Sequence, residues 1–133
     1  MPHALAEVAV SLTPLISIVD DDETVRDATA ALVRSLGYEA RTYSSAEAFL
    51  NSPGVDASDC LIVDVQMPGM SGLELQQALL GRSKPTPILF ITAFPDAEVR
   101  ARVLAAGAVN MLGKPCDHKV LVDSIEAALA PPA

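Results

Sequence analysis

The stretch LISIVDDDETVRDATAALVRSL, residues 15–36, gives the clearest indication of the fold class of this chain. It opens with a short, mostly apolar run and continues through three consecutive aspartates. It ends in a segment with apolar side chains at helical spacing: Val25, Ala28, Leu32, Val33 and Leu36. This order predicts a buried strand, an acidic turn and an amphipathic helix. A strand followed directly by a helix is the building unit of parallel α/β sheets.

The same alternation continues along the chain. Short apolar runs predict strands at 15–19, 39–43, 60–63, 87–91 and 109–112, and helical periodicity predicts helices at 23–36, 45–50, 71–80, 96–107 and 117–130. Strands and helices that alternate in this way form a doubly wound α/β fold, in which helices cover both faces of a parallel sheet. We expect five strands in the flavodoxin-like order 2-1-3-4-5.

Local chemistry marks several helix ends. Segments 44–47 (SSAE) and 71–74 (SGLE) each fit a capping box, in which a hydroxyl and a carboxylate satisfy free amide groups at a helix start. Glycine accepts the left-handed conformation that often ends a helix. Three glycines stand where helices should stop: Gly37, Gly81 and Gly107.

The length of 133 residues fits one domain, which we place at 15–129, with an N-terminal extension at 1–14 and a tail or linker start at 130–133. Nine Lys and Arg against 17 Asp and Glu give a formal charge of −8, which disfavours direct nucleic-acid binding. Charge-free stretches are too short to span a membrane. Two cysteines, Cys60 and Cys116, are too few for a disulfide framework, so we expect a cytoplasmic protein.

The polar residues that follow the strands are the informative ones. They are Asp20, Asp21 and Asp22 after the first strand, Asp64 after the third, Thr92 after the fourth and Lys114 after the fifth. Ligands of open parallel sheets bind outside the carboxyl ends of the strands, where the strand order reverses. In the order 2-1-3-4-5 this point lies between strands one and three, so we expect these side chains to converge.

Crowded carboxylates repel one another unless a positive charge compensates them. Hard oxygen donors without nearby His or Cys favour Mg²⁺, which together with Lys114 would balance the acids. A carboxylate beside Mg²⁺ and an ammonium group is suited to accept a phosphoryl group. The hydroxyl of Thr92 is able to donate a hydrogen bond to the same phosphoryl oxygens.

Four segments carry these residues: IVDDDETVR (18–26), DVQMPGMSGLEL (64–75), FITAF (90–94) and GAVNMLGKP (107–115). In this order and spacing they resemble the receiver domain of bacterial two-component response regulators, most closely the FixJ-like subclass. The resemblance runs over nearly the whole of 15–129 and implies the same flavodoxin-like fold.

The resemblance also implies roles for individual residues. Asp64 corresponds to the phosphorylated aspartate, Thr92 to the switch hydroxyl, and Lys114 to the phosphate-pairing lysine, followed by a cis bond to Pro115. The Mg²⁺ ligands would be Asp20, Asp21, Asp64 and the backbone carbonyl of Gln66. The run of three aspartates leaves a second register open, with Asp21 and Asp22 as the pair. An arginine six residues after the first acid, here Arg26, favours Asp20 and Asp21.

By the same resemblance, a sensor histidine kinase or a phosphotransfer protein would phosphorylate Asp64. The face built from helix four, strand five and helix five would then respond and control an output, with a phosphorylation-linked homodimer as one outcome. Such a protein is not an enzyme with outside substrates, because it catalyses only its own phosphorylation and dephosphorylation. Met111 stands where the family usually has Tyr or Phe, so an aromatic switch cannot operate there.

Two other functions compete with this one. A phosphatase of the haloacid-dehalogenase type also uses an aspartate at a strand end, but it places a second acid two residues later, where this chain has Gln66. A pure interaction module would not need the complete set of acids, threonine and lysine. We further expect Phe94, two residues after Thr92, to shield a phosphorylated Asp64 from water.

Overall fold

The five expected strands form one parallel sheet in the computed structural model, which describes residues 13–82 and 85–131. They are β1 (Leu15–Val19), β2 (Glu39–Tyr43), β3 (Cys60–Asp64), β4 (Ile88–Thr92) and β5 (Asn110–Gly113). The order is β2-β1-β3-β4-β5, and every neighbouring pair is parallel. The predicted strand order is therefore confirmed, while most of the 1–14 extension and half of the 130–133 tail lie outside the described residues.

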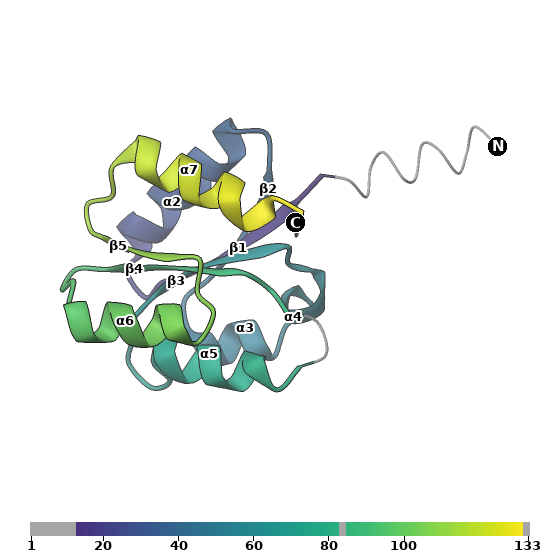
Figure 1. Ribbon diagram of the computed structural model, residues 1–133. Coiled ribbons are helices and arrows are strands. Elements are labelled where there is room, and N and C mark those ends of the chain that lie inside the picture. Colours follow the sequence, from purple (N-terminus) through teal and green to yellow (C-terminus); the bar gives the residue numbers. More distant parts are fainter. Residues whose placement is uncertain (1–12, 83–84, 132–133) are drawn as a thin grey trace.

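Helices cover both faces of this sheet. They are α2 (Glu23–Ser35), α3 (Ala46–Leu50), α4 (Gly54–Ala57), α5 (Gly72–Leu80), α6 (Ala97–Ala105) and α7 (His118–Leu129). Figure 1 shows α2 and α7 together on one face, with α3, α5 and α6 on the other. The short helix α4 was not predicted, because four residues are too few to show helical periodicity. Among the described residues, no helix combines the length and the apolar character that a membrane crossing requires.

Two separate cores result from this layering. Successive strand residues point to opposite faces, so β1 sends Ile16 and Ile18 toward α2 and α7, and Val19 toward the other helices. In the same way β3 divides its apolar side chains between the two cores. Because both faces are covered, β1, β3 and β4 are buried along their whole length. This rigid sheet fixes where its carboxyl ends lie.

The helix ends follow the predicted chemistry with two corrections. Gly37 and Gly107 have φ of 93° and 103°, as expected of left-handed helix stops. Gly81 also ends its helix, but with φ of −79°, so the left-handed conformation expected there was wrong. The capping box at Ser71 and Glu74 is present.

The capping box predicted at 44–47 is absent, because Ser45 rather than Ser44 is the N-cap of α3. The carboxylate of Glu47 instead accepts a hydrogen bond from the amide of Met70, which lies in the loop between β3 and α5. A local pattern suggested one partner for Glu47, and the folded chain supplies another.

Candidate functional site

The predicted site residues converge at the carboxyl edge of the sheet. Asp64 is the last residue of β3, Thr92 is the last residue of β4, and Asp20 directly follows β1. Lys114 directly follows β5, where its amide donates to the carbonyl of Thr92 at 2.7 Å. β1 and β3 are neighbours although β2 separates them in the chain, so the sheet itself brings the first acids to Asp64.

Lys114 bridges two carboxylates at this edge. Its Nζ lies 3.0 Å from Oδ2 of Asp20 and 3.0 Å from Oδ2 of Asp64. The side chain of Asp20 is fully buried and that of Asp64 is 8% exposed, while that of Lys114 is 15% exposed. Charges so far removed from water interact strongly, and each needs a partner.

Three acids form the group predicted to hold a cation. Asp20, Asp21 and Asp64 each offer a carboxylate oxygen, and these oxygens all lie within 4.8 Å of one another. Oδ2 of Asp20 is buried, and the ammonium of Lys114, 3.0 Å away, is its partner among the described residues. An oxygen-only donor set of three neighbouring carboxylates, with a single ammonium group beside it, fits a hard divalent cation such as Mg²⁺.

The structure separates the two registers that the sequence left open. Asp22 is the N-cap of α2, with its carboxylate accepting from the amides of Thr24 and Val25. Asp20 instead lies beside Lys114, and its carbonyl accepts from Arg26 at 2.8 Å. The geometry therefore groups Asp20 and Asp21, rather than Asp21 and Asp22, with Asp64.

Burial controls the titration of the central pair. It raises the pKa of Asp64 above the ordinary value of 3.8, against the opposing hydrogen bonds from Lys114 and from the amide of Gln66, and the charge of Asp20 raises it further. Burial alone would lower the pKa of Lys114, but its contacts with Asp20 and Asp64 reverse this and raise the pKa above 10.5. Lys114 therefore stays charged at neutral pH.

Thr92 is buried at the end of β4, and its Oγ1 accepts a hydrogen bond from the amide of Phe94 at 3.1 Å. The side chain of Phe94 is 70% exposed, so it is free of the core. Met111 is buried, and its carbonyl accepts from the guanidinium of Arg100 at 2.6 Å, which links α6 to β5. Nothing in the spacing of the sequence indicated the contact between Arg100 and Met111.

The loop between β3 and α5 borders the site. Gln66 is exposed, and its amide donates to Oδ1 of Asp64 at 3.1 Å. Gly69 has φ of 74°, which agrees with the turn expected at Pro68 and Gly69. The bond between Lys114 and Pro115 is cis, as the resemblance implied.

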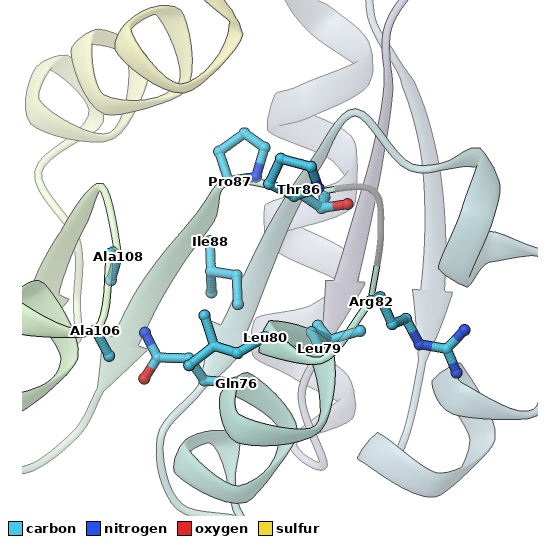
Figure 2. Close-up of a pocket in the computed structure, with 11 residues that line it drawn as sticks. Gln76, Leu79, Leu80, Arg82, Thr86, Pro87, Ile88, Ala106 and Ala108 are labelled. Atoms are coloured by element: carbon cyan, nitrogen blue, oxygen red, sulfur yellow. The ribbon is translucent and has the colours of Figure 1, made fainter.

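Two hollows in the surface of the described residues lie at different ends of the sheet. One of about 260 Å³ lies between α2 and α7 and has Lys114, Cys116 and Leu121 in its lining. Another of about 320 Å³ lies at the opposite edge of the sheet, where Figure 2 shows Ile88 at the start of β4 above Leu79 and Gln76 of α5. None of the described residues that line this second hollow is acidic, so it is separate from the carboxylate site.

Comparison with known proteins defines the class. The family described as "Response regulator receiver domain" matches residues 16–126. The chain belongs to this family of two-component signalling domains. The resemblance stated from its motifs is therefore confirmed.

Individual relatives agree with this assignment. The response regulator protein TmoT of Ectopseudomonas mendocina is 43% identical over 115 residues, which is 86% of this chain and 52% of the relative. The transcriptional regulatory protein FixJ of Bradyrhizobium diazoefficiens is 36% identical over 115 residues, or 86% of this chain and 56% of the relative. The chain thus spans about half the length of these curated relatives.

A solved structure matches the fold over its whole length. The response regulator receiver protein from Burkholderia phymatum is 42% identical, with a TM-score of 0.76, and the match covers 91% of this chain and all of that one. The flavodoxin-like sheet order expected from the sequence is the order of a receiver domain.

Proposed function

We propose that this domain is a phosphorylation-dependent switch in which Asp64 accepts a phosphoryl group from a phosphohistidine. The observation that carries the proposal is the position of Asp64 at the end of the central strand β3, with Lys114 on one of its oxygens and Asp20 and Asp21 close by. The transfer forms a bond between phosphorus and a carboxylate oxygen of Asp64 and breaks the bond between phosphorus and the histidine nitrogen.

We propose Mg²⁺ as the cofactor, held by Asp20, Asp21, Asp64 and the backbone carbonyl of Gln66. When bound, Mg²⁺ neutralises charge on the transferring phosphoryl oxygens and on the acids around them. The closeness of three carboxylates to one another, with only the ammonium of Lys114 paired to two of them, supports this assignment.

Lys114 and Thr92 act on the phosphoryl group itself. The ammonium of Lys114 already lies 3.0 Å from Asp64, so it pairs with a phosphoryl oxygen after a small movement. Thr92 lies on the neighbouring strand, directly after Ile91, which is the register partner of Asp64, and its hydroxyl is available to donate. Both contacts add binding energy only once the phosphoryl group is in place.

The response to phosphorylation passes to the face formed by α6, β5 and α7. Helices α6 and α7 are the fourth and fifth helices expected from the sequence, and β5 is the strand between them. Phosphorylation adds roughly 1.5 to 2 negative charges beside Thr92. Movement of Thr92 toward these charges would disturb its hydrogen bond with Phe94, at the loop that leads into α6. Met111 is buried and fills the space behind Thr92. It has no aromatic ring, so it cannot switch between two ring positions as Tyr or Phe does at this place in the family.

The partners follow from this chemistry. The phosphodonor is a sensor histidine kinase or a phosphotransfer protein, and a homodimer linked to phosphorylation is one way to transmit the output. We assign no direct nucleic-acid or membrane binding to this domain, and we propose a cytoplasmic location, in agreement with the two unpaired thiols of Cys60 and Cys116.

Mass spectrometry of the intact protein tests the proposal. The protein is incubated with acetyl phosphate, with and without Mg²⁺, beside the variant Asp64→Asn. We expect the wild type to gain the mass of one phosphoryl group only with Mg²⁺, and the variant to gain none. An unchanged wild-type mass would show that the domain is not a phosphoacceptor, and a gain by the variant would show that another residue reacts.

A further inference from the structure

Glu47 makes a contact that its local sequence does not predict. Its position fits a capping box, yet α3 is capped by Ser45 alone, through a hydrogen bond to the amide of Ala48. The carboxylate of Glu47 accepts at 3.1 Å from the amide of Met70, which lies 23 residues further along the chain. The contact joins the first turn of α3 to the loop between β3 and α5.

This loop, residues 65–71, is closed at its base next to Asp64. The amide of Gly72 donates to the carbonyl of Val65 at 2.9 Å. A Cβ atom at Gly72 would collide with the carbonyl of Asp64, so only glycine allows this close approach. The base of the loop is therefore fixed relative to Asp64.

Glu47 occupies the space against the tip of the same loop. Gly69 has φ of 74°, and a Cβ atom built there would lie 2.6 Å from Oε2 of Glu47. The same oxygen accepts from Met70. The middle of the loop is also held on the side of α3, because Met67 is buried in the core cluster that includes Ala46 of this helix.

Gln66 lies between the closed base and the part of the loop that α3 holds. Its amide donates to Oδ1 of Asp64, and its carbonyl belongs to the Mg²⁺ ligands proposed above. We propose that Glu47 is a positioning residue that holds this loop so that the Gln66 carbonyl is available to Mg²⁺, and thereby sets the affinity of the site for the ion. The inference rests on the proposed function, because it concerns the same cation.

The exposure of Glu47 sets the size of the effect. Its side chain lies at the surface, where a hydrogen bond to a charged acceptor is partly replaced by water when it is lost. We therefore expect removal of the carboxylate to weaken Mg²⁺ binding by about three- to tenfold. Because Met67 and Gly72 still hold the loop, the variant should remain folded.

An NMR titration with Mg²⁺ alone, without a phosphodonor, measures the dissociation constant. The wild type is compared with Glu47→Ala, with Glu47→Gln, whose amide oxygen still accepts from Met70, and with Glu126→Ala, which removes an exposed carboxylate from α7. We expect weaker binding in Glu47→Ala alone. Equal affinity in Glu47→Ala and Glu126→Ala would overturn the inference, and so would an equal loss in Glu47→Gln, because charge rather than the hydrogen bond would then be responsible.

A double-mutant cycle with Gly69→Ala gives a second readout. The added methyl group meets the Glu47 carboxylate, and the φ of 74° strains a residue with a Cβ atom, so Gly69→Ala disturbs the same contact from the side of the loop. We expect Glu47→Ala to weaken Mg²⁺ binding less in the Gly69→Ala background than in the wild type. Fully additive effects would show that Glu47 and the loop tip act independently.

The wild-type titration separates this inference from the proposed function. A wild type that does not bind Mg²⁺ contradicts both. A wild type that binds Mg²⁺ and takes a phosphoryl group, with unchanged Mg²⁺ affinity in Glu47→Ala, contradicts only the role of Glu47. The amide resonance of Met70 reports directly on the contact, and it should shift in Glu47→Ala before any Mg²⁺ is added.

Discussion

Replacement of Lys114 by methionine isolates the electrostatic balance of the site. Methionine keeps most of the length of the lysine side chain and removes its charge. In the wild type the ammonium lies 3.0 Å from a carboxylate oxygen of Asp20 and 3.0 Å from one of Asp64. The variant leaves these two buried acids facing each other without compensation.

Coulomb's law sets the scale of the loss. At an effective dielectric constant of about 20, each of the two contacts is worth about 5–6 kcal/mol, and two carboxylate charges no more than 4.8 Å apart repel by at least about 3 kcal/mol. Desolvation of the ammonium offsets much of the attraction. Removal of one partner from a buried pair typically costs about 3–5 kcal/mol, and the partial exposure of Lys114 reduces this to about 2–4 kcal/mol.

Urea unfolding followed by circular dichroism at pH 7 without Mg²⁺ measures this cost. We expect Lys114→Met to lower the free energy of unfolding by about 2–4 kcal/mol. The double variant Lys114→Met/Asp20→Asn should recover about 1–3 kcal/mol of it, because one of the two repelling charges is gone. A single variant within about 0.5 kcal/mol of the wild type, or a double variant no more stable than the single one, would refute the reasoning.

Three further predictions concern Asp64, the two cysteines and Phe94. Burial raises the pKa of Asp64 in the folded protein above the ordinary value of 3.8. The stability that this carboxyl contributes is therefore fully present below pH 3.8, and it is lost as the pH rises through the pKa of the folded state. Asp64→Asn should therefore unfold at a higher urea concentration than the wild type at pH 7, but not below pH 3.8, and a less stable variant at pH 7 would contradict this. Burial raises the pKa of Cys60 to about 12, whereas Cys116 is partly exposed. A thiol reagent at pH 8 should therefore label Cys116 and spare Cys60 until the protein is unfolded. Rapid labelling of both thiols in the native protein would count against the burial of Cys60. Phe94→Ala should speed dephosphorylation roughly fivefold, a change of about 1 kcal/mol in the barrier, if the ring shields phosphorylated Asp64; an unchanged rate in a phosphate-release assay would show that it does not.

The strands and the convergence of the site residues could be predicted because both depend on short-range patterns. Buried parallel strands are apolar throughout, and the order 2-1-3-4-5 places the residues after β1 and β3 at one edge. Asp20, Asp64 and Lys114 therefore meet as expected. Arg26 favoured Asp20 and Asp21 over the second register, and in the folded chain Asp22 caps α2 and stands outside the group of three carboxylates.

The remaining features depend on contacts between distant segments. The carboxylate of Glu47 accepts a hydrogen bond from a loop amide, and the guanidinium of Arg100 donates one to a carbonyl of β5. No spacing along the chain reveals such partners. Gly81 shows the same limit on a smaller scale, since a glycine at a helix end permits the left-handed conformation without requiring it. Local patterns indicated where helices end, but not how their side chains are used.

Asp64 is the residue proposed to receive the phosphoryl group, and chemical trapping identifies the acceptor directly. Protein treated with acetyl phosphate and Mg²⁺ is reduced with borohydride, which converts an aspartyl phosphate to homoserine, and then digested for peptide mass spectrometry. We expect homoserine at position 64, in a yield that falls to the background level without Mg²⁺. Homoserine at position 20 or 21, or a phosphoryl group that survives reduction on a hydroxyl side chain, would contradict it.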